Sequence, residues 1–420
     1  MVGTARYVPG LSHRRLARTD CGCLGRMPLR PSQRSEVPPF AVMTVLQAVA
    51  AARAQGRDVI SLCAGEPGQG APSAVRQAAA QLMMDAIPLG YSETQGILPL
   101  RQEIAAHYAR WYALALDPAQ VCITTGSSGA FLLAFLAAFD AGDRVALARP
   151  GYPAYVNILR SLGCEVVELD TGAAVRFQPT VDLLARAHAE SPLAGVVLAS
   201  PANPTGTMIA APDLTAIMRW CAAAGVRVIS DEIYHGVTFT GEPGTCAWQL
   251  DRSAVVISSF SKYWGMTGWR LGWLLMPDDL ASRIDALAGN LALCAPVPAQ
   301  HAAVAGFSAA SYAECEAAVA GFAQARANVI DALPDLGWTG VAPTDGAFYV
   351  YAGIAGQLGP HRDSVAWCAA LLAEQDVAIT PGVDFDGRHG HEYVRLSLAP
   401  GPAPVAEAIR RILDFQRSFA

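Results

Sequence analysis

One side chain in this sequence stands out for the chemistry that it could do. Lys262 is the only lysine among the 420 residues, and every other member of the Lys and Arg set is an arginine. A guanidinium stays protonated in proteins, whereas a lysine amine with a lowered pKa can attack a carbonyl group and form a Schiff base. A general preference for arginine would leave one lysine at any position, so the interpretation depends on its neighbours.

The residues around Lys262 suit a ligand that carries a carbonyl group and negative charge. Val255-Val256-Ile257 is typical of a buried strand, and three serines, Lys262 and then Arg270 follow its end. Hydroxyl groups, an amine and a guanidinium at one strand end favour an anionic aldehyde. Pyridoxal 5′-phosphate (PLP) is a ligand of this kind, and enzymes hold it through a lysine Schiff base. The residues therefore indicate PLP as the cofactor and Lys262 as a catalytic residue.

The stretch from Ser259 to Gly272 resembles the signature of the class I and II aminotransferases, the PLP enzymes of fold type I. It reads Ser-x-Ser-Lys-x-x-x-Met-x-Gly-x-Arg-x-Gly, and further motifs of that family follow in the right order from about Arg34 to the C-terminus. The resemblance implies an enzyme that moves an amino group between an L-amino acid and a 2-oxo acid by a ping-pong mechanism. It also implies an α/β fold, with a mostly parallel seven-stranded sheet in a large domain and a smaller α+β domain.

The resemblance gives roles to polar side chains that follow other predicted strands. Asp231 would keep the pyridine nitrogen of PLP protonated, and Tyr234 and Asn203 would bind the ring 3′-oxygen. A carboxylate at the end of a buried strand is costly without a cationic partner, and the ring nitrogen would supply one. Tyr152 would stack on the ring.

Two further groups of residues complete the expected site. Three elements would hold the phosphate group of PLP. They are a helix N-terminus with Gly126, Ser127 and Ser128, the turn around the lysine with Ser259 and Arg270, and Tyr91 of a partner chain. The substrate carboxylate would form a bidentate pair with Arg395, with Gly65 and Asn203 beside it. Tyr155 and Glu232 are expected to be structural.

Strand-like and helix-like segments alternate in a way that would position these residues. Strands are expected at 58–63, 121–124, 144–149, 195–200, 226–230, 255–257 and 272–276, and helices at 41–54 and 284–293. The alternation predicts βαβ units and a mainly parallel sheet, whose ligands bind beyond the carboxyl ends of the strands. Strands at 346–351, 377–380 and 393–397, with a helical region at 302–332, predict an α+β unit near the C-terminus.

Four regions are expected along the chain, because 420 residues are too many for one small core. Residues 1–33 would be a disordered extension, and 34–66 an N-terminal segment that contributes to the small domain. Residues 67–298 would form the large PLP-binding domain, and 299–420 the C-terminal small domain.

Composition argues against several kinds of partner. A net charge of −6 with 16% charged residues disfavours a nucleic-acid surface. No apolar run reaches the roughly 18 residues of a membrane span. Ten scattered cysteines without spaced histidine clusters indicate reduced thiols in the cytoplasm and no metal site. The family resemblance implies a homodimer with active sites at the subunit interface, acting on amino acids and 2-oxo acids as small-molecule substrates.

One feature bears on the substrate, and other reaction classes stay open. Some aspartate-specific members of the family bind the distal carboxylate of the substrate with an arginine of the partner chain. No Lys or Arg occurs between Arg283 and Arg326, so we expect a substrate with a neutral or apolar side chain, and glutamate or alanine is an alternative for one half-reaction. Carbon–sulfur β-lyases and cyclising synthases share the scaffold and are the alternatives. A PLP-sensing transcription regulator is less favoured, because the segment before Arg34 is shorter than the roughly 50 residues of a small DNA-binding domain.

Overall fold

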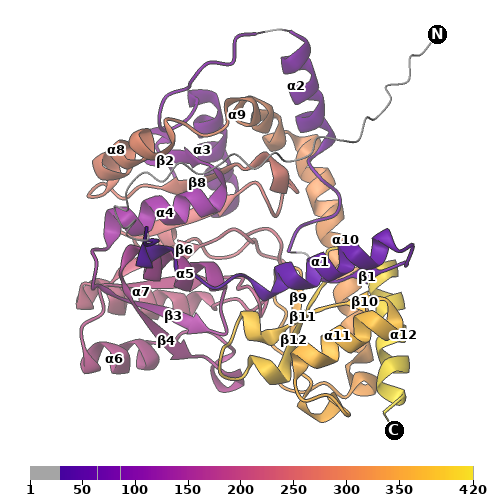
Figure 1. Cartoon of the computed structure of the whole chain (residues 1–420). Coiled ribbons are helices and arrows are strands. Elements are labelled where there is room, and N and C mark those ends of the chain that lie inside the picture. The colour runs from indigo at the N-terminus through magenta and orange to yellow at the C-terminus, as the bar shows by residue number, and fades with distance from the viewer. Residues whose placement is uncertain (1–28, 64, 86, 420) are drawn as a thin grey trace, which may run out of the picture.

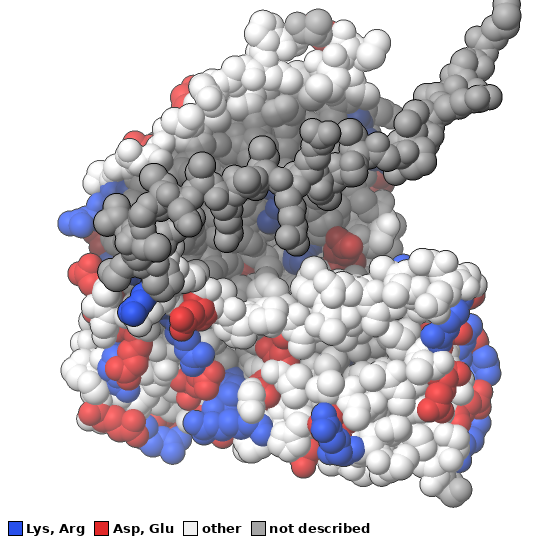
Figure 2. All heavy atoms as spheres, in the orientation of Figure 1, with Lys and Arg blue, Asp and Glu red and all other residues white. Residues whose placement is uncertain are grey.

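The computed structural model describes residues 29–63, 65–85 and 87–419 (Figure 1). Most of the extension expected at 1–33 therefore lies outside the described residues. Among these residues, no helix is both long and apolar enough to cross a membrane. On the face that Figure 2 shows, acidic and basic side chains lie interspersed.

A seven-stranded mixed sheet forms the centre of the larger part of the molecule. Its strand order is β2 (Val121–Thr124), β8 (Gly272–Leu275), β7 (Val255–Ser259), β6 (Arg227–Asp231), β5 (Gly195–Ala199), β3 (Arg144–Arg149) and β4 (Glu165–Asp170). The strands from β7 to β4 pair in parallel, whereas β8 is antiparallel to both of its neighbours. The predicted α/β fold with a mostly parallel seven-stranded sheet is confirmed.

Helices cover both faces of this sheet, which explains why its strands are almost continuously apolar. Successive strand residues point to opposite faces, so Val228 of β6 joins one core and Ile229 joins the other. The first core includes helices α3 (Leu98–Tyr112), α6 (Val181–Glu190) and α7 (Ala211–Ala224). The second includes α4 (Gly126–Ala138), α5 (Pro153–Leu162) and α8 (Ala281–Ala292).

A second layer is built from both ends of the described chain (Figure 1). Its three-stranded antiparallel sheet has the order β11 (Thr380–Pro381), β12 (Tyr393–Ser397) and β9 (Tyr349–Gly353). The short strand β1 (Ile60–Ser61) pairs in parallel with β10 (Val377–Ala378). The surrounding helices are α1 (Ala41–Ala54), α10 (Ala309–Leu336), α11 (Ser364–Gln375) and α12 (Pro402–Arg417); α2 (Ser73–Met84) and α9 (Val297–Ala303) lie toward the first sheet. The pairing of β1 with β10 supports a shared N- and C-terminal domain, whose boundaries stay a prediction.

Several predicted elements differ from the observed ones for local reasons. The region 302–332 is not one helix, because a new helix starts after Ser308, whose hydroxyl accepts a hydrogen bond from the backbone N–H of Ser311. Strand β9 begins three residues after Gly346, because Ala347 has a positive φ of 55°. Strand β4 was not predicted; it is an edge strand in which three of the six residues are acidic.

Candidate active site

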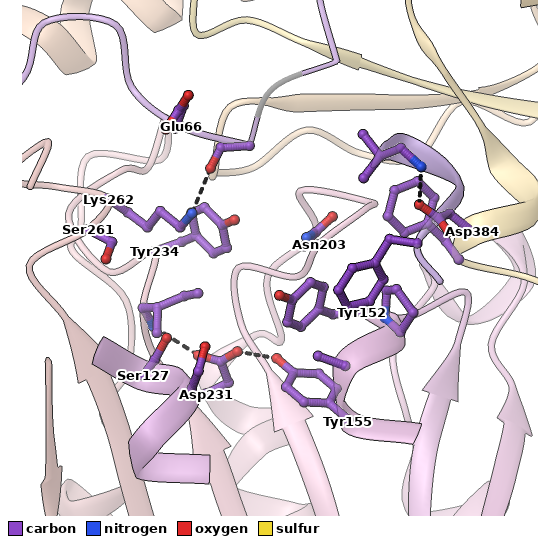
Figure 3. A pocket seen from close by; sticks show the side chains of 18 of the residues that line it. Glu66, Ser127, Tyr152, Tyr155, Asn203, Asp231, Tyr234, Ser261, Lys262 and Asp384 are labelled. Atoms are coloured by element: carbon purple, nitrogen blue, oxygen red, sulfur yellow. Dashed lines mark hydrogen bonds between the residues drawn. The ribbon is translucent and has the colours of Figure 1, made fainter. Parts of the chain in front are cut away.

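A cavity of about 390 Å³ lies beyond the carboxyl ends of the parallel strands, where the two layers meet (Figure 3). This is the position at which α/β sheets bind ligands. Most of the predicted site residues line it: Gly65, Ser127, Ser128, Tyr152, Asn203, Asp231, Tyr234, Lys262, Arg270 and Arg395. The structure therefore brings together residues that are spread over 330 positions of the sequence, from 65 to 395.

Lys262 presents a half-buried amine to this cavity. Its Nζ donates a hydrogen bond to the carbonyl oxygen of Gly65 at 2.6 Å. Burial lowers the pKa of the Lys262 amine to about 8, and Arg395 and Arg270 add to this effect, whereas Asp231 and a nearby glutamate oppose it. A substantial neutral fraction near neutral pH is the property that a nucleophilic lysine needs.

The turn that carries Lys262 is anchored by aromatic packing. The buried side chains of Tyr263 and Trp264 pack edge-on against each other, with ring centroids 5.0 Å apart. Trp264 Nε1 donates to the carbonyl oxygen of Gly306 at 2.9 Å, and Tyr263 Oη donates to Glu316 Oε1. Buried aromatic residues with satisfied polar atoms hold a backbone firmly, so the backbone of the turn that carries Lys262 is held in place.

Asp231 lies at the end of β6 with only 3% of its surface exposed. Burial raises the pKa of this carboxyl to about 6, while hydrogen bonds from the Tyr155 hydroxyl and the Ile233 backbone N–H act to lower it. A buried carboxylate that lacks a full counter-charge suits a cationic group such as a protonated pyridine nitrogen.

Tyr155 was predicted to be structural, but it lines the cavity and its hydroxyl donates directly to Asp231 (Figure 3). It lies on the first turn of α5, and its ring packs edge-on against that of the N-cap residue Tyr152, with ring centroids 5.3 Å apart. Glu232 agrees with its expected structural role: it accepts a hydrogen bond from the backbone N–H of Ala247, away from the cavity.

Arg395 of β12 is 4% exposed and lies between two aromatic rings. Its guanidinium carbon is 4.4 Å from the ring centre of Tyr349 and 4.7 Å from that of Phe385. Nη1 donates to Asn203 Oδ1 at 2.9 Å, and Nη2 donates to the carbonyl oxygen of Cys63 at 2.7 Å, but the buried Nε has no partner. A buried donor without a partner is costly, and a carboxylate in the cavity would remove that cost.

The N-terminus of α4 forms the other polar end of the cavity. Ser127 and Ser128 line it, and Arg270 lies over the helix end, because a Cβ added to Gly126 would stand 2.6 Å from Arg270 Nη2. Free backbone N–H groups at a helix N-terminus together with a guanidinium bind phosphate well. Ser261 lines the cavity here.

Three residues predicted to contact the phosphate, Gly126, Ser259 and Tyr91, are not among those that line the cavity. Ser259 is 1% exposed, and its hydroxyl accepts a hydrogen bond from the Ser261 backbone N–H at 2.9 Å, so it shapes the turn and does not face the cavity. Tyr91 is 82% exposed and lies outside the cavity. Its expected contact is with a partner chain, which a single chain does not test.

Several cavity residues were not predicted from the sequence. The hydroxyl groups of Tyr349 and Tyr234 are hydrogen-bonded to each other at 2.8 Å. A Cβ added to Gly65 would stand 2.7 Å from the Tyr349 hydroxyl oxygen. Apolar side chains also line the cavity: Phe40, Val42, Leu46, Phe131, Ile158 and Phe385. The cations that line the cavity among the described residues are Lys262, Arg270 and Arg395.

These residues fit PLP on structural grounds. The cavity has a lysine amine with a lowered pKa, a buried carboxylate without a full counter-charge and a helix N-terminus with a guanidinium above it. Those are the partners that an aldehyde, a pyridine nitrogen and a phosphate group require. Tyr152, the residue expected to stack on the ring, lies at the side of the cavity (Figure 3).

Comparisons with known proteins agree over nearly the whole chain. The family model "Aminotransferase class I and II" matches residues 57–412. A valine–pyruvate aminotransferase of Mycobacterium tuberculosis is 52% identical over 384 residues, which cover 91% of this chain and 97% of the relative. An aspartate aminotransferase of Thermotoga maritima is 31% identical, covering 91% and 98%. The crystal structure of an aminotransferase from M. tuberculosis, at 51% identity, has a TM-score of 0.89 and covers 93% of this chain and 100% of that one.

Proposed function

Because the chain belongs to the class I and II aminotransferases, we propose that it transfers the amino group of an L-amino acid with an apolar side chain to pyruvate. It is an aminotransferase that depends on PLP. The preference for an apolar donor rests chiefly on the residues that line the cavity, and the acceptor on the name of the M. tuberculosis relative at 52% identity.

The charges of the cavity carry the proposed donor preference. Each of its three cations has another role: Lys262 as the reacting amine, Arg270 at the phosphate end and Arg395 for the α-carboxylate. No further cation of the described lining is left for a second carboxylate, whose burial without a partner would be costly. The apolar wall formed by Phe40 and its neighbours instead favours a side chain such as that of valine.

The chain's own groups divide the work of the transfer. PLP, when bound, supplies an aldehyde that takes up the amino group and a ring that accepts the electrons of the broken Cα–H bond. Asp231 holds a proton on the ring nitrogen, and Arg395 orients the substrate through its α-carboxylate. The neutral amine of Lys262 takes the proton from the substrate Cα and returns it in the reverse direction. Tyr234, which is hydrogen-bonded to Tyr349, and Asn203 line the cavity and would bind the ring 3′-oxygen.

A homodimer in the cytoplasm completes the proposal. Tyr91 is 82% exposed, and exposed apolar side chains lie near it in the sequence: Met83, Met84, Ile87 and Leu98. A group of this kind is typical of a surface that a partner covers, and the partner's Tyr91 would then reach the phosphate end. Light scattering after gel filtration tests the dimer, and cell fractionation tests the location.

A panel of amino donors tests the proposed reaction. Each donor is mixed with PLP-loaded protein, and the absorbance of the cofactor reports the first half-reaction; pyruvate and 2-oxoglutarate are then compared as acceptors. We expect valine to react at least about tenfold more efficiently than aspartate, since a buried unpaired carboxylate costs more than 1.4 kcal/mol. Faster reaction with aspartate would refute the proposed donor. Release of ammonia and a 2-oxo acid without conversion of the cofactor would favour a lyase instead.

A further inference from the structure

Part of the apolar lining of the cavity comes from a short segment that we call the N-terminal arm, residues 38–46. The arm contributes Phe40, Val42 and Leu46 to the cavity and includes the first turn of α1. The Phe40 ring lies nearly parallel to that of Tyr152, with ring centroids 6.3 Å apart and 15° between the planes. The position of the arm therefore sets the shape of the space in which a substrate side chain would lie.

The arm has an unusual N-terminal cap. The N-cap residue of α1 is Phe40, whose side chain has no oxygen that could accept hydrogen bonds from the first turn. Asp384, more than 340 positions later in the sequence, supplies both oxygens: Oδ1 accepts from the Ala41 N–H at 2.6 Å, and Oδ2 accepts from the Val42 N–H at 2.9 Å. Asp384 itself lines the cavity (Figure 3). A carboxylate at a helix N-terminus also interacts favourably with the helix dipole.

Asp384 belongs to a run of three residues, Asp384-Phe385-Asp386, that attaches to both layers. The Phe385 ring covers Arg395, and its carbonyl oxygen accepts a hydrogen bond from the Gly151 N–H at 3.0 Å. Asp386 Oδ1 lies 3.3 Å from Nε of Arg149, a buried arginine at the end of β3. The run is thereby fixed at the edge of the cavity, so the arm that Asp384 holds is fixed there too.

We propose that Asp384 is a positioning residue for substrate selection: it holds the arm against the cavity and thereby sets the preference for a branched apolar amino donor. This inference rests on the proposed function. Without the two hydrogen bonds the first turn of α1 frays, and Phe40, Val42 and Leu46 no longer form a fixed wall. A branched side chain loses the apolar contacts that this wall provides, whereas the methyl group of alanine has little contact to lose. Contacts of this size in a hydrophobic pocket discriminate by about 10- to 200-fold.

The test compares L-valine with L-alanine in the first half-reaction of Asp384→Ala. We expect the efficiency with valine to fall about tenfold and that with alanine to fall less than about threefold, so that the valine-to-alanine ratio drops. Asp384→Asn keeps one oxygen acceptor and should give an intermediate ratio. The matched control is Asp363→Ala, which removes an equivalent cap, the bond from the Ala366 N–H to Asp363 Oδ1 at 2.8 Å, at the start of α11. It should leave the ratio unchanged.

Hydrogen exchange of the arm gives a readout that does not depend on activity. In PLP-free Asp384→Ala, peptides that cover 38–46 should exchange faster than in the natural sequence, and those of α11 should not. Unchanged exchange of the arm, or an unchanged valine-to-alanine ratio, would overturn the proposed role of Asp384. If the unsubstituted enzyme reacts with valine but the ratio survives the substitution, the proposed function stands and only this role fails. If the unsubstituted enzyme does not react with valine, the proposed donor fails, and with it the selection assigned to Asp384.

Discussion

Asp231→Asn is a substitution whose effect on folding can be worked out from the structure. In the PLP-free protein, burial raises the pKa of the Asp231 carboxyl from 3.8 to about 6. The folded chain therefore binds this proton more tightly than the unfolded chain does. A difference of about 2 pKa units, at ~1.4 kcal/mol each, amounts to about 3 kcal/mol. Above a pH of about 6, ionised Asp231 lowers the free energy of unfolding by this amount, and an asparagine does not.

The stability difference should depend on pH in one direction. Urea denaturation of PLP-free Asp231→Asn should give a free energy of unfolding about 3 kcal/mol above that of the natural sequence near pH 8. The advantage should shrink as the pH falls from 6 to 3.8 and vanish below 3.8, where both states carry the neutral acid. Asp279→Asn is the control, because the Asp279 side chain is 57% exposed and pairs with Arg227 at the surface, where such pairs contribute little.

Cofactor binding should favour the natural sequence over Asp231→Asn. The protonated ring nitrogen of PLP supplies the missing counter-charge to Asp231 but not to an asparagine, so about 3 kcal/mol should appear as a roughly hundredfold weaker affinity for PLP. Equilibrium titration of the PLP-free proteins by cofactor absorbance measures it. If Asp231→Asn and the natural sequence had equal free energies of unfolding near pH 8 as well as below pH 3.8, and also bound PLP equally well, the assignment of Asp231 to the ring nitrogen would be contradicted.

Three further substitutions or conditions test other parts of the site. The rate at which PLP-free protein combines with PLP should rise about tenfold per pH unit up to a pH near 8 and then level off. The reason is that the pKa of the Lys262 amine is about 8 and only the neutral form attacks. A flat profile between about pH 6 and 8 would count against this role of Lys262. Arg395→Lys should weaken substrate binding about 10- to 100-fold, mainly in the dissociation constant of the first half-reaction, because an ammonium cannot form the bidentate pair; an unchanged constant would move the carboxylate site elsewhere. Gly65→Ala should lower activity, because the added Cβ would stand 2.7 Å from the Tyr349 hydroxyl oxygen. A second substitution, Tyr349→Phe, should restore part of the lost activity. If it restored none, the loss would be assigned to the backbone at Gly65.

The polar core of the site could be predicted because its residues follow strands directly. Asn203, Asp231 and Lys262 each come within a few residues of the end of a strand, and the carboxyl ends of parallel strands meet at one edge of the sheet. Their residue types also carry chemistry that a surface loop does not need. The position of each side chain is thus determined by local sequence and by one rule of topology.

The apolar wall could not be predicted, because nothing local distinguishes it. Val42 and Leu46 look like part of the core face of any amphipathic helix, and Phe40 precedes that helix. Their place at the cavity depends on Asp384, which is more than 340 positions away. The role of Tyr155 was hidden in a similar way, since only the direction of α5 relative to β6 shows that its hydroxyl reaches Asp231. Contacts of this kind are set by packing between layers and not by residue spacing.

Two groups in the cavity carry opposite charges that the chain itself does not fully satisfy. Asp231 has hydrogen bonds but no full counter-charge, and the buried Nε of Arg395 has no partner. Each therefore costs stability while the cavity holds no ligand. A cationic ring nitrogen removes the first cost and a substrate carboxylate removes the second, so cofactor and substrate should each raise the free energy of unfolding through a different residue. The two costs can be separated, because Asp231→Asn removes the cost of the buried carboxylate and leaves that of the Arg395 Nε. A measurement of stability can therefore test the assignment of each ligand to its residue.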